Sequence, residues 1–337
     1  MDIQDYCQRL PKVELHAHLN GSLSMNTLQK LYKMQHSDIT ECEQTSMDAV
    51  KFSSLSECFK VFDIAHAVTI TPQAVFLAAC DVIKEFHDDN VVYLELRSTP
   101  RAVKDSMTKL EYLEAIIRAF EISKSQFPRI IVKLLVSINR KEGYKSAKEN
   151  VDLAIQLMKQ FPQYVVGVDL SGDPKVKESF LPLLEIARKT GLKVAAHCAE
   201  IPDEIDIVDT LKFKPDRLGH CTCIHPTLQG SKQLFDMLLD SKVPVELCLT
   251  SNVKCKTVSS YETHHFKYFY ETGHPITIGT DDKGVFNTCL SKEFEILNST
   301  FNIGKEQLKK LSLLSVQYSF ADTEEKKRLS SIIEKFE

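Results

Sequence analysis

The sequence predicts an α/β fold, a single (β/α)8 TIM barrel with extra helices between its first two strands. Three observations predict it: eight short apolar runs rich in β-branched residues, a longer segment with helical spacing after each run, and polar residues at the ends of most runs. Alternation of this kind is typical of βαβ units, whose strands pair in parallel. Eight such units in a chain of 337 residues most economically close into a barrel.

The eight predicted strands follow one another along the whole chain. They cover residues 13–19, 91–97, 130–138, 165–170, 193–198, 217–221, 243–249 and 276–280. An open doubly wound sheet is the alternative fold. The glycine-rich phosphate-binding patterns of that class, GxGxxG and GxxxxGK[ST], do not follow the first strand, which favours the barrel.

The connection between the first two strands, residues 20–90, is far longer than one crossover helix requires. We therefore expect extra helices there, covering the barrel mouth. Within this stretch one helical stripe is formed by Leu55, Cys58, Phe59, Phe62 and His66.

Composition restricts the function classes. No Pro/Gly/Ser-rich linker or charge block divides the chain, so we expect one domain, residues 1–337. Lys and Arg number 42 against 46 Asp and Glu, a net charge of −4, so we expect no nucleic-acid or membrane partner. The opening residues lack the apolar stretch of a signal peptide, and the ten cysteines fit reduced thiols. We expect a cytoplasmic monomer.

The strand ends carry the candidate metal site. In a barrel the active site is built from the carboxyl ends of the strands. His16 and His18 lie two apart on the first strand, so both point to the same side. His197 ends the fifth strand and Asp281 follows the eighth, which completes a donor set suited to Zn²⁺ with a position left for water.

A binuclear centre is the alternative, because some metal-dependent barrels bridge two ions with a modified lysine at the end of the fourth strand. Residues 169–173 occupy that position and contain no lysine. We therefore expect one Zn²⁺ per chain.

Three further groups can handle protons. His220 and Asp282 end the sixth and eighth strands beside the proposed ligands, where they could contact a metal-bound water. Glu200 lies three residues beyond His197 and is free for acid catalysis. Helix capping is the alternative role for Asp282 and Glu200. We expect His264-His265 to be solvated loop histidines.

At this point the motifs resemble a known family. HAHLNGS at 16–22, DLSGDP at 169–174, HCAE at 197–200, GH at 219–220 and TDD at 280–282 resemble the adenosine/AMP deaminase family of the amidohydrolase superfamily. The resemblance implies a mononuclear zinc on the four ligands above and Glu200 as the proton donor to purine N1. It further implies that His220 and Asp282 orient and deprotonate the zinc water, and that the Gly172 backbone contacts the base.

The chain departs from adenosine deaminase proper at the sugar end, where Asn20 replaces the aspartate of an HVHLDG motif. With RSTPR at 97–101, this looks like the adenosine deaminase-like branch, which converts N6-methyl-AMP and water to IMP and methylamine. An amide, hydroxyls and an arginine would favour a purine nucleoside monophosphate with its 5′-phosphate.

The substrate-binding residues expected on this basis are His18, Asn20, Leu55, Cys58, Phe59, Phe62, His66, Ser98, Thr99, Pro100, Arg101, Asn139, Gly172 and Asp282. The phosphate should lie among Asn20, Ser98, Thr99, Arg101 and His66. Cys58 stands where similar adenosine deaminases carry an aromatic residue, which implies room for an N6 substituent.

Three other functions stay open at this stage. The chain could deaminate the nucleoside adenosine, or it could be a catalytically inactive barrel kept for binding. It could also catalyse another amidohydrolase reaction, which would require two metals.

Overall fold

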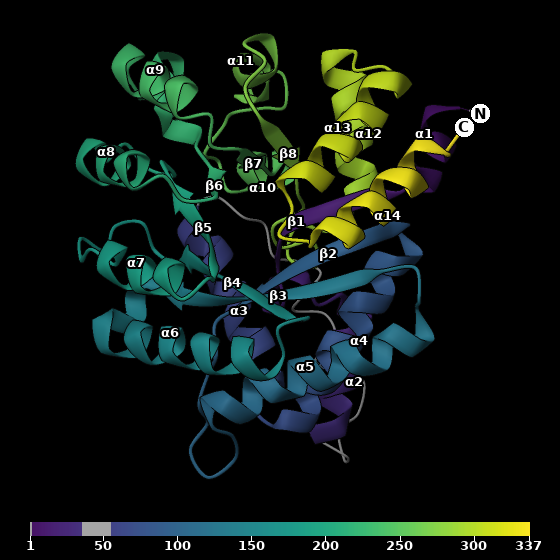
Figure 1. Cartoon of the computed structure of the whole chain (residues 1–337), viewed down its shortest axis with the longest axis vertical. Helices are drawn as coiled ribbons and strands as arrows, with labels where there is room; N and C mark the ends of the chain where they lie inside the picture. Colours follow the sequence, from purple (N-terminus) through teal and green to yellow (C-terminus); the bar gives the residue numbers. More distant parts are fainter. Residues whose placement is uncertain (1, 36–54) are drawn as a thin grey trace.

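The barrel is the central feature of the fold. The computed structural model describes residues 2–35 and 55–337, with side chains from Phe62 onward in the helix that begins at Leu55. Eight parallel strands pair in chain order, β1 to β8, inside a ring of helices, which confirms the predicted fold class (Figure 1). The strands are β1 Lys12–His18, β2 Val91–Ser98, β3 Ile131–Asn139, β4 Val165–Ser171, β5 Lys193–Cys198, β6 Arg217–His220, β7 Val245–Leu247 and β8 Ile276–Ile278.

The two ends of the sheet meet just after β8. Ala17 and Asp281 form a parallel bridge. The Asp281 N–H donates to the His16 carbonyl at 2.7 Å, and the His18 N–H donates to the Asp281 carbonyl at 2.9 Å. The backbone contact that joins β8 to β1 therefore also brings three of the predicted metal ligands together.

The predicted extra helices between the first two strands are present. They are α2 Met25–Gln35, α3 Leu55–Val68 and α4 Pro72–Asp88. Helix α4 begins at Pro72 for local reasons. The Thr71 side chain caps it by accepting from the Ala74 N–H at 3.1 Å, and proline suits the first helical position. Phe62, Asp63 and His66 of α3 line the pocket at the barrel mouth, so α3 lies over it.

The other helices surround the barrel and follow the strands. They are α1 Ile3–Arg9, α5 Lys109–Gln126, α6 Gly143–Gln160, α7 Leu181–Lys189, α8 Glu204–Phe213, α9 Lys232–Ser241, α10 Leu249–Lys254, α11 Phe266–Glu271, α12 Leu290–Phe301, α13 Lys305–Tyr318 and α14 Thr323–Glu334. The Tyr6 and Phe336 rings lie 5.2 Å apart, so the two ends of the chain are neighbours (Figure 1). Within the described ranges, no helix combines the length and apolar character needed to cross a membrane.

The seventh strand is shorter than predicted. Sequence patterning extends it over residues 243–249, whereas β7 ends at Leu247 and α10 begins at Leu249. The buried Glu293 carboxylate of α12 accepts from the Thr250 N–H at 3.0 Å, which satisfies a backbone donor at the start of α10. A side chain far along the chain thus stabilises this helix, and Ser251 and Asn252 lie on α10 rather than on a strand.

Charged residues fill the barrel interior beneath its carboxyl end. Arg217 Nε donates to Glu246 Oε1 at 2.6 Å, and its other nitrogens reach Glu95 and the Tyr318 carbonyl. Arg97 joins the same Glu246 to Asp169, whose carboxylate lies 2.9 Å away. All five charged side chains are fully buried, so each carboxylate depends on its arginine for compensation.

Arg217→Ala should therefore destabilise the fold by about 3 to 5 kcal/mol, because it leaves the buried Glu95 carboxylate without its arginine and Glu246 with Arg97 alone. The shift in the midpoint of urea unfolding measures this. As a control, Lys232→Ala removes an exposed lysine paired with Asp236 and should leave the midpoint nearly unchanged. Equal midpoints for the two variants would contradict the dependence on Arg217.

Candidate active site

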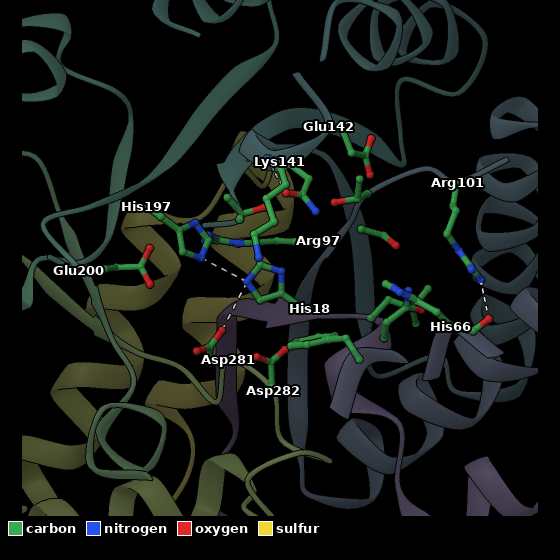
Figure 2. A pocket seen from close by; sticks show the side chains of 18 of the residues that line it. His18, His66, Arg97, Arg101, Lys141, Glu142, His197, Glu200, Asp281 and Asp282 are labelled. Atoms are coloured by element: carbon green, nitrogen blue, oxygen red, sulfur yellow. Dashed lines mark hydrogen bonds and ion pairs between the residues drawn. The ribbon is translucent and has the colours of Figure 1, made fainter. Parts of the chain in front are cut away.

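Three histidines and one aspartate come together at the carboxyl end of the barrel. One ligand atom from each of His16, His18, His197 and Asp281 lies within 4.8 Å of all the others. His18 Nε2 is 3.3 Å from His197 Nε2 and 3.4 Å from Asp281 Oδ1, and His16 Nε2 is 3.4 Å from the same oxygen. Figure 2 shows His18, His197 and Asp281 converging at the pocket.

Hydrogen bonds behind the cluster fix the ring orientations. His16 Nδ1 donates to Glu246 Oε2 at 2.7 Å, and His197 Nδ1 donates to the Leu170 carbonyl at 3.0 Å. Ser251 Oγ donates to Asp281 Oδ2 at 2.7 Å. With Nδ1 engaged in these bonds, the rings of His16 and His197 each direct Nε2 at the cluster, the nitrogen that a metal would bind.

A buried nitrogen without a hydrogen-bond partner indicates whether this cluster of side chains suits a cation. His16 Nε2 is buried and makes no hydrogen bond with any described residue. Burial and the Arg97 guanidinium oppose protonation of His16, yet the Asp281 and Glu246 carboxylates outweigh them and raise its pKa to about 9. Burial lowers the pKa of His18 to about 3. The carboxylates thus favour a positive charge beside His16, while the neutral His18 ring keeps a nitrogen able to bind a metal, so a divalent cation fits the four residues.

Three other titratable groups surround this cluster. His220 Nε2 lies 3.8 Å from Asp281 Oδ2 and 3.9 Å from Glu200 Oε2. Burial raises the pKa of the Glu200 carboxyl, more than the nearby histidines lower it, which favours its protonated form. Asp282 also lines the pocket, as Figure 2 shows, and is almost completely buried.

A glycine makes room for Asp282. A Cβ on Gly21 would lie 1.7 Å from Asp282 Oδ1, closer than any real contact. Gly21 belongs to the short helical turn Asn20–Ser22 directly after β1. The glycine of the HAHLNGS motif therefore sets the position of a carboxylate from the opposite end of the chain.

The pocket brings most of the predicted residues together. Those that line it are His18, Asn20, Phe62, His66, Ser98, Thr99, Arg101, Asn139, Gly172, His197, Glu200, His220, Asp281 and Asp282. His16 lies buried behind it. Pro100, two residues after the end of β2, is buried and does not line the pocket, so its predicted contact with the substrate is not supported. Leu55, Cys58 and Phe59 lie outside the residues with described side chains.

Arg101 and His66 form the far side of the pocket. In Figure 2 they lie opposite Glu200, with the histidine–aspartate cluster between. Arg101 Nη2 donates to the carbonyls of His66 and Thr69 at 2.9 and 2.8 Å, while its buried Nε has no hydrogen-bond partner among the described residues. Burial, together with the positive charge of Arg101, lowers the pKa of the His66 ring to about 4. The cationic group at this end is therefore Arg101.

Some residues of the site escaped sequence reasoning. Glu246 and Arg97 belong to strands that read as apolar runs, and a charged residue inside such a run is the signal that marks them. Lys141 and Glu142 line the pocket from the turn after β3. The expectation that His264 and His265 are solvated is wrong, since both rings are fully buried. Their loop folds back beneath the end of β6, which local sequence does not reveal.

The barrel and its histidine–aspartate group define a metal-binding barrel enzyme. Residues 11–336 match the family described as adenosine deaminase, and the chain belongs to that family. The N6-methyl-AMP deaminase of Bos taurus is 44% identical over 321 residues, 94% of this chain and 91% of that protein. The Homo sapiens N6-methyl-AMP deaminase is 44% identical over 322 residues, 94% and 90% of the two chains. The crystal structure of Arabidopsis ADAL complexed with IMP superposes with a TM-score of 0.89 at 36% identity, covering 98% of each chain.

Gly21→Ala should lower the rate of purine deamination by about 10²-fold, because the added methyl group must displace the Asp282 carboxylate by more than 1 Å. Steady-state kinetics measures the loss, and metal content should stay at the wild-type level. In Gly304→Ala the new methyl group meets only the end of the Gln307 side chain, so this control should retain full activity. Wild-type kinetics in Gly21→Ala would contradict the placement of Asp282.

Proposed function

We propose that this chain hydrolyses N6-methyl-AMP to IMP and methylamine. The observation that carries the proposal is a single pocket with the histidine–aspartate cluster and Glu200 on one side and Arg101 on the other. A purine held at the cluster would direct its 5′-phosphate toward that arginine. The relatives from Bos taurus and Homo sapiens are N6-methyl-AMP deaminases, and Arabidopsis ADAL has been crystallised with IMP and with GMP, both purine nucleoside monophosphates.

Zinc is the metal we assign to His16, His18, His197 and Asp281. Three imidazole nitrogens and one carboxylate oxygen are a donor set that suits Zn²⁺ and leaves a position for water. When bound, the ion supplies Lewis acidity and lowers the pKa of a water molecule toward neutrality.

Side chains of the protein carry out the remaining proton transfers. Asp282 accepts one proton of the water while the water oxygen adds to C6 of the purine. Glu200 donates its proton to N1, so the ring accepts the electron pair without building a full negative charge. The raised pKa of Glu200 keeps this proton available. The C6–N6 bond then breaks, methylamine leaves with the proton held by Asp282, and the C6 hydroxyl proton restores Glu200.

The phosphate end accounts for the preference for a nucleotide. Arg101 carries the positive charge there, and Ser98, Thr99 and Asn20, which also line the pocket, supply hydroxyl and amide groups. Ser98 Oγ lies 2.7 Å from the Tyr112 hydroxyl, which in turn donates to Asn20 Oδ1 at 3.4 Å. At Asn20 an amide replaces the carboxylate of adenosine deaminase proper, which removes a negative charge that would repel a phosphate.

Glu200→Gln should lower kcat by at least ~10²-fold, because glutamine keeps the shape of the side chain but cannot donate the proton. Metal analysis of the purified variant should still find one zinc per chain, whereas Asp281→Ala should lose it. Glu204→Gln, an exposed glutamate nearby on α8, is the matched control and should behave as wild type. Loss of metal together with activity in Glu200→Gln would assign Glu200 a ligand role instead.

A product assay with N6-methyl-AMP, AMP, N6-methyladenosine and adenosine tests the substrate. We expect N6-methyl-AMP to have the highest kcat/KM. Arg101→Ala should raise KM for both nucleotides by roughly tenfold to a hundredfold, since a charge-assisted contact contributes about 1.5–3 kcal/mol. Residual turnover of the nucleosides should change far less.

The control for this assay is Arg118→Ala, which removes an exposed arginine of α5 paired with Gln73. It should leave every KM at the wild-type value. Adenosine as the best substrate would replace the proposed function with nucleoside deamination, and equal losses on nucleosides and nucleotides in Arg101→Ala would refute phosphate binding at this residue.

A further inference from the structure

Two buried histidines lie behind His220. His264 and His265 have no exposed surface, and their rings stack with centroids 4.2 Å apart and planes at 18°. Neither residue lines the pocket. Buried polar rings of this kind need hydrogen-bond partners. The partners of both rings connect them to His220.

A backbone amide determines which nitrogen of His264 carries the proton. The Phe266 N–H donates to His264 Nδ1 at 3.0 Å, so Nδ1 must be an acceptor. Burial, together with the neighbouring histidines, lowers the pKa of His264 well below its usual value, so the ring is neutral. A neutral imidazole with an acceptor at Nδ1 holds its proton at Nε2.

That proton in turn orients an amide. His264 Nε2 lies 3.0 Å from Asn252 Oδ1, and because it is the donor, the atom facing it must be the amide oxygen. The amide nitrogen then faces the other way, toward Thr257 Oγ1 at 3.2 Å and His220 Nδ1 at 3.4 Å. Asn252 is almost completely buried in α10, so no solvent competes for this arrangement.

His220 is the last residue in this series of hydrogen bonds. An Asn252 N–H pointing at Nδ1 makes that nitrogen an unprotonated acceptor, so the ring carries its proton on Nε2. Nε2 is the atom that faces Asp281 Oδ2 and Glu200 Oε2. His265 acts on the backbone of the same residue, since its Nε2 donates to the His220 carbonyl at 2.8 Å.

The geometry points to Asn252 and His264 as positioning residues that fix His220 as a hydrogen-bond donor, with its Nε2–H directed into the pocket. His220 then stabilises the attacking oxygen and does not take its proton, which goes to Asp282. This inference deepens the proposed deamination and rests on it for the catalytic consequence. The tautomer itself is a property of the chain that can be measured without substrate.

The proton position can be read directly. In the zinc-loaded protein labelled with 15N-histidine, long-range 1H–15N correlation spectra distinguish protonated from unprotonated ring nitrogens, and the signals of His220 are those lost in His220→Asn. We expect His220 in the substrate-free wild type to carry its proton on Nε2. A wild-type His220 protonated on Nδ1 would overturn the inference whatever the substrate is.

Two pairs of variants test this relay, the series of hydrogen bonds from His264 through Asn252 to His220. Asn252→Asp places an acceptor against both histidines, so it should move the His220 proton to Nδ1 and lower kcat about tenfold to a hundredfold with little change in KM. Asn252→Ser is its partner and should lose kcat without forcing the Nδ1-protonated form. His264→Leu removes the donor to Asn252, whereas His264→Gln can still donate an N–H there and should restore both the wild-type spectrum and kcat.

The outcomes separate the inference from the proposed function. A shifted His220 tautomer in Asn252→Asp, with rescue in His264→Gln relative to His264→Leu, supports the relay even if N6-methyl-AMP proves not to be the substrate. An unchanged His220 tautomer and unchanged kcat in Asn252→Asp would overturn it. Equal losses in His264→Gln and His264→Leu would show that His264 acts by packing alone, which would overturn its positioning role.

Discussion

Glu246 is the buried charge on which the barrel interior and the metal-binding end both depend. One of its oxygens accepts from Arg217, and the other accepts from both Arg97 and His16. Two guanidinium groups hold the pKa of this carboxylate well below its usual range, although burial alone would raise it. The Glu246 carboxylate also accepts the hydrogen bond from His16 Nδ1. This one hydrogen bond connects the buried ion pairs of the barrel interior to the metal-binding residues.

The carboxyl ends of the strands turn sharply where the site is built. Ala199, His220, Cys221 and Asp281 have φ values of 53°, 64°, 53° and 60°, a region that side chains with a Cβ seldom adopt. Such residues cost about 1 to 3 kcal/mol each and persist where the surrounding structure holds them. Ala199 and Asp281 directly precede Glu200 and Asp282, which line the pocket, and His220 is the last residue of β6. The hydrogen bond from His265 to the His220 carbonyl is one of the contacts that hold this geometry.

Charge is distributed along the pocket in a way that suits its proposed ligand. The cluster end combines imidazoles with the carboxylates of Asp281 and Asp282, and a divalent cation would neutralise much of that negative charge. The far end has Arg101, whose Nη2 donates to two backbone carbonyls. Among the described residues its guanidinium forms no ion pair, so its charge is available to an anionic group of the substrate. The two ends thus favour different parts of one purine nucleotide.

Sequence patterns predict the eight strands, the long insertion after the first of them and the residues at the strand ends, because periodicity and strand-end chemistry are local properties. They could not reveal that Thr250 to Asn252 form a helix, since Glu293 stabilises that helix from a distant part of the chain. Which groups surround His220 depends on how distant segments pack together. In the sequence, His264 cannot be told from a solvent-exposed loop histidine, and it is the fold that buries it against Asn252. The proton position on each ring follows from hydrogen bonds between residues that are separated in sequence.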